Sequence, residues 1–105
     1  MFNKQYIICS AIYIKDKNIT MEDLPENING GLVIAGRRHS DAMQTVVALK
    51  GEEYLSEMAK VEGRIIMGFL TNDNWFLTRE DAVPIAKESG QLNHNANGLI
   101  SEHLY

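Results

Sequence analysis

Residues 64–77 have the sequence pattern of a β-hairpin, and this pattern constrains the fold more than any other part of the chain. The segment RIIMGFLT at 64–71 is rich in strand-forming residues, and NDN at 72–74 is a tight-turn signal. The apolar segment WFL at 75–77 follows the turn directly. Because strands joined by so short a turn pair antiparallel, the chain is expected to contain an antiparallel sheet.

Two further strands are predicted in the first half of the chain. The segment YIICSAIYI at 6–14 is nearly continuous in apolar character and is typical of a buried strand. LVIA at 32–35 predicts a short second strand that ends at Gly36. The polar stretch between them, residues 15–31, is punctuated by turn-forming residues. It predicts a loop that either contains a turn of helix near residues 21–24 or connects the two strands as a hairpin.

A helix is predicted after the second strand. Ser40 is a plausible N-cap, and Asp41 lies in the first turn, where its charge suits the helix dipole. Apolar residues then recur at helical spacing as far as residue 50. Gly51 interrupts this pattern, and a second short helical piece is expected to reach about Lys60.

The last helix is predicted over residues 79–89. Thr78 and Asp81 resemble a capping box, and Gly90 stands at the C′ position. Pro84 lies beyond the first turn, so a local kink is expected. The order strand, strand, helix, strand, strand, helix predicts an α+β fold, a small antiparallel sheet with two main helices packed on it.

The length and composition limit the class of protein further. With 105 residues, the chain is expected to form a single domain over residues 1–105. No apolar run reaches the roughly 18 residues of a membrane span, and the start MFNKQY lacks the features of a secretory signal. The one cysteine, Cys9, cannot form an internal disulfide or a thiolate zinc cluster. We expect a cytoplasmic protein that contacts no membrane, and its net charge of −4 argues against a long nucleic acid as partner.

The segment GRRHSD at 36–41 stands where a strand is predicted to stop and a helix to begin. A helix N-terminus offers unpaired N–H donors and a partial positive charge, so it suits an anion. Arg37, Arg38 and His39 add guanidinium and imidazole groups that bind phosphate or carboxylate. The alternative is that both arginines are solvated surface residues and that His39 bonds to Asp41 or to the backbone.

The predicted hairpin brings aromatic and polar residues together. These are Phe69, Trp75 and Phe76, beside Thr71, Asn72 and Asn74. Nucleobases stack on such rings, and amide side chains bind their edges. The alternative is an ordinary core hairpin, which we favour for Phe69 and Phe76. Arg79 again places an arginine at the start of a predicted helix, unless it only pairs with a nearby acidic residue.

Catalysis is the weaker interpretation of these residues. His39 and Asp41 could serve as the acid–base groups of a hydrolase. No nucleophile elbow, Walker loop or HExxH pattern is present in the sequence. His94 and His103 lack metal-ligand spacing, and three converging ligands for a catalytic metal cannot be assembled. We therefore expect no catalytic residue, no metal and no cofactor.

Four sequence blocks, taken together, resemble a pattern of small phage-encoded proteins. They are GRRHSD at 36–41, GFLTNDNWFLTREDA at 68–82, IAKESGQL at 85–92 and SEHLY at 101–105. The pattern is similar to that of the Thoeris anti-defence protein 1 family, the phage signal sponges, and it covers roughly residues 32–105. This chain departs from it at Trp75, Pro84 and His103, which bears on the ligand more than on the fold.

The resemblance implies a non-catalytic protein that sequesters the cyclic ADP-ribose isomer made from NAD by a defence TIR domain. It also implies an α+β homodimer or a higher homo-oligomer such as a hexamer. Some members of that family also bind cyclic oligonucleotides at a separate site. The implied ligand contacts are Arg37, Arg38 and His39 to phosphates, Phe69, Thr71 and Asn74 near base or ribose, and Arg79 as a further anion contact.

The leading hypothesis is therefore a phage-type anti-defence protein that binds a small phosphorylated nucleotide in the host cytoplasm. Two alternatives remain open. One is a hydrolase that degrades such a nucleotide with His39 and Asp41. The other is a homo-oligomeric assembly protein without a ligand, which self-associates through LISEHLY at residues 99–105.

Overall fold

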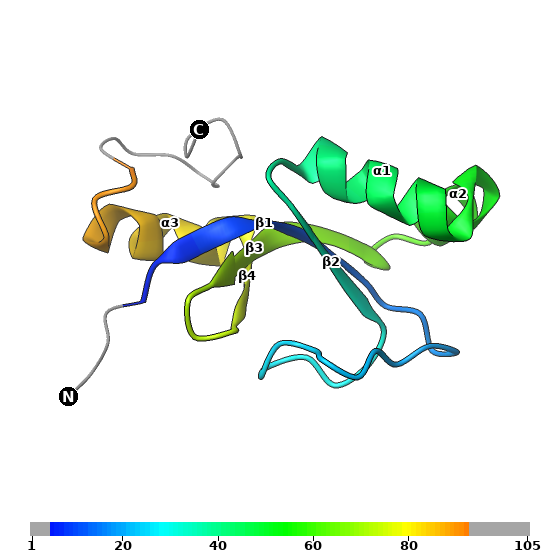
Figure 1. The fold of residues 1–105 in the computed structure, drawn as a ribbon, viewed down its shortest axis with the longest axis horizontal. Coiled ribbons are helices and arrows are strands. Elements are labelled where there is room, and N and C mark those ends of the chain that lie inside the picture. The colour runs from blue at the N-terminus through cyan, green and yellow to red at the C-terminus, as the bar shows by residue number, and fades with distance from the viewer. Residues whose placement is uncertain (1–4, 93–105) are drawn as a thin grey trace.

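A computed structural model of the chain describes residues 5–92. It contains a four-stranded antiparallel sheet with the strand order β2-β1-β3-β4, together with three helices, and it confirms the predicted α+β fold (Figure 1). In chain order the elements are β1 (Ile7–Ile14), β2 (Leu32–Gly36), α1 (His39–Lys50), α2 (Glu52–Ala59), β3 (Ile65–Thr71), β4 (Phe76–Thr78) and α3 (Arg79–Glu88).

The register of the sheet places Gly36, Ser10, Phe69 and Leu77 in one row across the four strands. The next row joins Gly68 of β3 to Thr78 of β4. A bulge between Ile7 and Cys9 interrupts the pairing of β1 with β3. Gly36 lies just before α1 and Thr78 just before α3, so these rows set where the two helices begin relative to the sheet.

Helices α1 and α3 cover the same face of the sheet. On β1, Ile12 and Ile14 pack against Ala42 and Val46 of α1. A second cluster at the other end of this face contains Phe69 of β3 and Leu77 of β4 with residues of α3. Because side chains two residues apart on a strand share a face, Ile12, Ile14 and the paired Ser10–Phe69 row all lie on this side. Figure 1 shows α1 above the strands with α2 next to it, and α3 extending towards the other end of the molecule.

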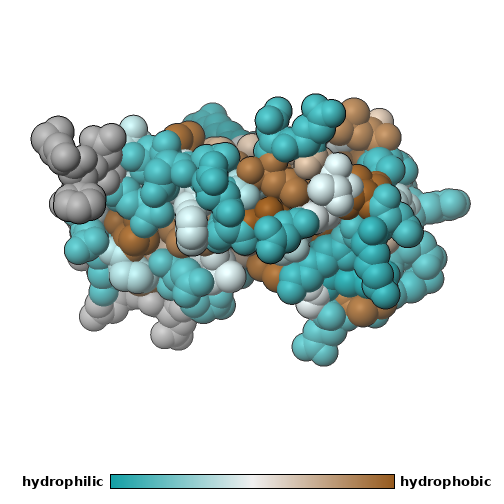
Figure 2. Space-filling model, turned by 90° about the horizontal axis from the view of Figure 1, so that it is seen from below, coloured by the Kyte–Doolittle hydropathy of each residue, from teal (hydrophilic) through white to brown (hydrophobic). Residues whose placement is uncertain are grey.

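The loop over residues 15–31 covers part of the opposite face. Leu24 and Ile28 of this loop pack against a cluster that contains Ala11, Val33 and Phe76. Figure 2 views the molecule from this side and shows apolar surface between the polar side chains. The sheet is therefore buried by helices on one side and by an irregular loop on the other.

Asn27 fastens this loop to the outer edge of β4. Its Nδ2 donates to the carbonyl oxygen of Phe76 at 2.7 Å, and its Oδ1 accepts from the backbone nitrogen of Phe76 at 2.8 Å. The backbone nitrogen of Glu26 donates to the carbonyl oxygen of Asn74 at 2.8 Å. At an exposed strand edge, unpaired backbone N–H and carbonyl groups can pair with another chain. The Asn27 amide occupies these two groups of Phe76 and so protects this edge of β4.

The structure corrects one detail of the sequence prediction, the N-cap of α1, and decides between the two alternatives for residues 15–31 in favour of the hairpin. The N-cap of α1 is Arg38, two residues before Ser40, because the carboxylate of Asp41 reaches back to accept the Arg38 backbone N–H at 3.2 Å. No helical turn forms near residues 21–24. The backbone N–H of Met21 instead donates to the carbonyl of Gly31 at 3.2 Å, across the connection that joins β1 and β2 as an antiparallel hairpin.

The predicted ends of α3 are confirmed. Thr78 is its N-cap, and its hydroxyl oxygen accepts from the backbone nitrogen of Asp81 at 3.2 Å. Gly90, with a φ of 81°, follows the C-cap Ser89. Pro84 lies inside this helix, which continues to Glu88.

Candidate functional site

Arg37 and Arg38 lie in the turn between β2 and α1. Gly36 ends β2 so close to the first turn of α1 that a Cβ on it would lie 2.7 Å from the backbone nitrogen of Ala42. The carbonyl oxygen of Arg38 accepts from that same nitrogen at 3.2 Å. Arg37 is exposed and Arg38 is half-buried. Glycine at this position therefore brings the two arginines to the end of the helix without a spacer.

His39, the first residue of α1, is tied to the middle of the sheet. Its Nε2 lies 2.8 Å from the carbonyl oxygen of Gly68 on β3. A carbonyl only accepts, so Nε2 carries the hydrogen and donates it. The imidazole also packs edge-on against Phe69, with ring centroids 5.1 Å apart. The backbone partner expected as the alternative role of His39 is thus present.

The N-terminus of α3 also lies next to Gly68. Gly68, which accepts from His39, pairs with Thr78, the N-cap of α3. Arg79 follows as the first residue of α3. Neighbouring strands lie about 4.8 Å apart, so the two helix ends flank the same short stretch of β3. Figure 1 shows α1 and α3 running in opposite directions from the middle of the sheet.

Charges of both signs gather at these two helix ends. Arg37, Arg38 and Arg79 supply three guanidinium groups. The first turns contain Asp41 in α1 and Glu80 and Asp81 in α3. The Asp41 carboxylate is engaged with the Arg38 backbone N–H. The helix dipoles add a partial positive charge at each end, so an anion between the helix ends would be attracted by both helices.

Thr71 and Asn74 belong to the turn of the hairpin. The Thr71 hydroxyl donates to Asp73 and accepts from the backbone nitrogen of Trp75 at 3.1 Å. The bond from Thr71 lowers the pKa of the Asp73 carboxyl from its ordinary value. Asn74 is exposed and adopts a φ of 60° in the turn. Thr71 lies three positions along β3 from Gly68, roughly 10 Å away, so this turn lies apart from the helix ends.

Phe69 is fully buried, with 0% of its surface exposed. Its ring belongs to the cluster that contains Ile7 and Ala82 and Ala86 of α3. A ligand base cannot stack on it in this arrangement of the chain. The structure therefore joins Phe69 to the site only through the ring of His39, which packs against it.

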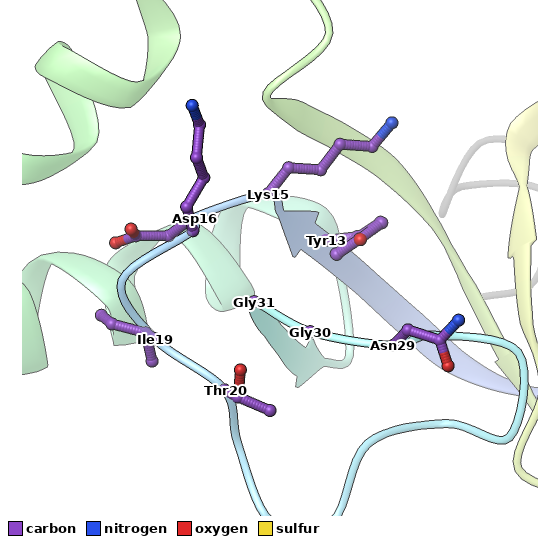
Figure 3. A pocket seen from close by; sticks show the side chains of 9 residues that line it. Tyr13, Lys15, Asp16, Ile19, Thr20, Asn29, Gly30 and Gly31 are labelled. Carbon is purple, nitrogen blue, oxygen red and sulfur yellow. The ribbon is translucent and has the colours of Figure 1, made fainter.

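A separate pocket opens where the end of β1 meets the loop over residues 15–31. It has a volume of about 400 Å³, and Figure 3 shows the side chains around it. Its lining residues are Tyr13, Lys15, Asp16, Lys17, Ile19, Thr20, Asn29, Gly30 and Gly31. The sequence prediction did not find this pocket, because its walls come from a loop that folds back on itself.

Asp16, which lines this pocket, is bonded to Tyr54 of α2. The Tyr54 hydroxyl donates to Asp16 Oδ2 at 2.7 Å, and the backbone nitrogen of Asn18 donates to Oδ1 at 3.0 Å. The Tyr54 bond and the Asn18 bond hold the pKa of the Asp16 carboxyl below its ordinary value. Burial and the Asp16 bond raise the pKa of Tyr54 to about 12. This pair joins α2 to the loop.

A comparison with protein families gives one match, to the phage T4 y16D protein over residues 6–105. The chain belongs to the phage T4 y16D protein family. The match begins at β1, so it includes both helix ends, the hairpin and the loop pocket. Searches of curated proteins and of solved structures gave no match.

Membership of the y16D family confirms the phage protein that the sequence blocks predicted. The description of this family names no ligand, so the nucleotide stays a hypothesis. The C-terminal segment at residues 99–105, together with His94 and His103, lies outside the described residues. The self-association predicted through that segment therefore stays a prediction.

Among residues 5–92, no group of three His, Cys, Asp or Glu side chains lies close enough to hold a metal ion. In the same part of the chain, no helix has the length and apolar character needed to span a bilayer.

Proposed function

We propose that this y16D-family protein binds and sequesters a small phosphorylated nucleotide without degrading it, as a phage anti-defence protein in the cytoplasm of the infected cell. The proposed ligand is a cyclic ADP-ribose isomer, the class implied by the resemblance to the Thoeris anti-defence protein 1 family. The observation that carries the proposal is that the N-termini of α1 and α3 both lie next to Gly68, with Arg38 and His39 at the start of α1 and Arg79 at the start of α3.

The chemistry of such a ligand suits the two helix N-termini next to Gly68. A pyrophosphate needs several N–H donors and positive charge at short range, and two helix ends supply backbone donors without mobile side chains. Arg38 follows β2 and Arg79 follows β4, on opposite sides of β3 in the strand order, and in the proposal each guanidinium binds one phosphate. The net charge of −4 acts against a long polyanion, whereas one compact anion senses mainly the nearby charges.

The contacts of His39 and Asp41 favour binding over hydrolysis. A general base needs a nitrogen or carboxylate directed at the reacting group. His39 Nε2 donates to the Gly68 carbonyl, and the Asp41 carboxylate accepts from the Arg38 backbone N–H. Both groups therefore stabilise the start of α1, and the hydrolase becomes the second candidate.

A homodimer or a higher homo-oligomer such as a hexamer completes the proposal. The helix-end site lies on one surface of the described chain, and a second copy would supply the other wall of a deeper pocket. Met67, next to Gly68, is 38% exposed, which is unusual for an apolar residue in the middle of a sheet. A partner chain packed near Met67 would bury it and enclose the ligand.

Calorimetry with cyclic ADP-ribose isomers tests the binding, and mass spectrometry of the ligand released by heat tests sequestration. We expect one class of tight sites and recovery of the unaltered ligand. Arg38→Ala and Arg79→Ala should each weaken binding by about 1.5–3 kcal/mol, the contribution of a charged hydrogen bond. Lys60→Gln is the matched control, since Lys60 pairs with Glu57 on the exposed end of α2.

Two results would decide against the proposal. A linear or cleaved product that accumulates with time, and that disappears in His39→Gln, identifies the hydrolase. An absence of binding heat with every isomer, in a sample that circular dichroism shows to be folded, excludes cyclic ADP-ribose isomers as the ligand.

A further inference from the structure

The loop pocket has the size and lining of a small-molecule site, and it is distinct from the helix ends. Its volume of about 400 Å³ falls within the range of roughly 300–1,000 Å³ that is typical of ligand pockets. Tyr13 and Ile19 provide apolar surface, and Thr20 and Asn29 provide a hydroxyl and an amide. The residues of the proposed nucleotide site contribute nothing to its walls.

Positive charge dominates the pocket wall. Lys15 and Lys17 contribute two ammonium groups, and the Lys15 Nζ lies 5.8 Å from the centre of the Tyr13 ring. Asp16 is the single acid among the lining residues, and its carboxylate is engaged by the Tyr54 hydroxyl and the Asn18 N–H. Figure 3 shows the Asp16 carboxylate directed away from Lys15, Tyr13 and Asn29. A ligand in the pocket therefore meets two cations beside an aromatic ring.

Backbone hydrogen bonds hold the pocket wall in place. The N–H of Gly31 donates to the carbonyl of Ile19 at 2.9 Å, and a bridge joins Gly31 to Thr20. Gly31 adopts a φ of 88°, and a Cβ on it would lie 2.3 Å from the carbonyl oxygen of Ile14. Glycine is required here for the loop to close against β1. A pocket built in this way needs little rearrangement when a ligand enters.

We propose that this pocket is a second ligand site, for a small organic phosphate that carries a ring, with nucleoside monophosphates as the fitting class. The phosphate lies between Lys15 and Lys17, where two ammonium groups neutralise its charge. The ring packs against Tyr13 and Ile19, and the Asn29 amide binds its polar edge. This inference stands independently of the nucleotide site at the helix ends.

Amide NMR with AMP, GMP, CMP and UMP tests the pocket, with adenosine and inorganic phosphate as separate probes. We expect the amide signals of Gly30 and Gly31 to shift, with a Kd between about 10 µM and 1 mM for a nucleoside monophosphate. The phosphate alone and the nucleoside alone should each bind at least about tenfold more weakly, since each lacks half of the contacts.

Variants separate this site from the helix ends. Lys15→Gln combined with Lys17→Gln should raise the Kd at least about tenfold, and Asn29→Ala about threefold. All three residues are exposed, so the variants are expected to fold. Lys60→Gln controls for general charge and should leave the Kd unchanged.

Three results would overturn the inference. The first is an absence of shifts at Gly30 and Gly31 with all four nucleotides at about 10 mM, well above the expected Kd. The second is an unchanged Kd in the double lysine variant. The third is equal affinity for inorganic phosphate, which would remove the ring-bearing ligand.

Discussion

His39 Nε2 donates to the carbonyl oxygen of Gly68 at 2.8 Å, and this bond joins the first residue of α1 to the middle strand of the sheet. Gly68 also pairs with Thr78, which caps α3. One residue of β3 therefore links the starts of both helices that cover the sheet. The proposed anion site depends on this link, because it sets the position of both helix ends.

Replacement of His39 by alanine should destabilise the fold. The variant loses the bond to Gly68 and the packing on Phe69, so the free energy of unfolding should fall by about 1.5–3 kcal/mol. Urea denaturation followed by circular dichroism measures the change. Ser40→Ala is the control, because Ser40 is exposed and does not cap α1, and its effect should stay within about 0.5 kcal/mol. Equal losses in the two variants would contradict the roles given to these residues.

Asn27 should matter more than its exposed position suggests. Asn27→Ala leaves the N–H and the carbonyl of Phe76 without their amide partners, which should cost about 1–3 kcal/mol. Glu26→Ala keeps its backbone bond to Asn74 and should be nearly neutral. Thermal unfolding of the two variants under identical conditions compares them. A neutral Asn27→Ala variant would show that the loop does not protect the edge of β4.

The Tyr54–Asp16 pair should make stability depend on pH at both extremes. The folded pKa of Asp16 lies below its ordinary value of 3.8, so its contribution is present above that value and is lost as the pH falls through the folded pKa. The pKa of Tyr54 is raised from 10.0 to about 12, so its contribution is present below pH 10 and is lost as the pH rises towards 12.

Tyr54→Phe removes the hydroxyl from this pair. The variant should be less stable at neutral pH by about 1–2 kcal/mol, and its stability should change less below pH 4 and above pH 10. Urea midpoints measured across the pH range give both quantities. A variant with the same pH profile as the wild type would contradict the coupling of the two groups.

Gly31 should tolerate no side chain. A Cβ there would meet the Ile14 carbonyl oxygen at 2.3 Å, and the φ of 88° is unfavourable for other residues, so Gly31→Ala should cost about 3 kcal/mol or more. Gly51→Ala has a similar φ of 92° but open space around it, so it should cost about 1 kcal/mol. Denaturation measures the loss of stability in each variant. The difference between the two losses gives the cost of the contact between the new Cβ and the carbonyl of Ile14. A Gly31→Ala variant as stable as Gly51→Ala would contradict that packing.

The strands and helices were predictable because their signals are local. The segment at 64–77 contains both its strand-forming residues and its turn signal, and Thr78 lies three residues from the Asp81 N–H that it caps. The start of α1 was misplaced because Ser40 has the side chain of a typical N-cap, whereas arginine is not a preferred N-cap residue. The helix nevertheless begins after Arg38, whose backbone N–H donates to the carboxylate of Asp41.

The contacts of the candidate sites were less predictable because they are long-range. Nothing adjacent to His39 in the sequence indicates that its partner is the backbone of Gly68. The loop pocket joins Tyr13 to Asn29 through a loop whose path depends on Asn27 and its bonds to Phe76. The adjacent glycines Gly30 and Gly31 were the one local signal that the chain approaches another segment closely there.

Amide NMR during titration with a cyclic ADP-ribose isomer tests the central claim most directly, because it reports where the ligand binds. We expect the largest shifts at the amides of His39 and Ser40 in α1 and of Arg79 and Glu80 in α3, whose N–H groups lie in the first turns. The shifts should vanish in a variant that combines Arg38→Ala with Arg79→Ala. Unchanged amide signals at both helix ends, with saturating ligand and a folded protein, would contradict the claim.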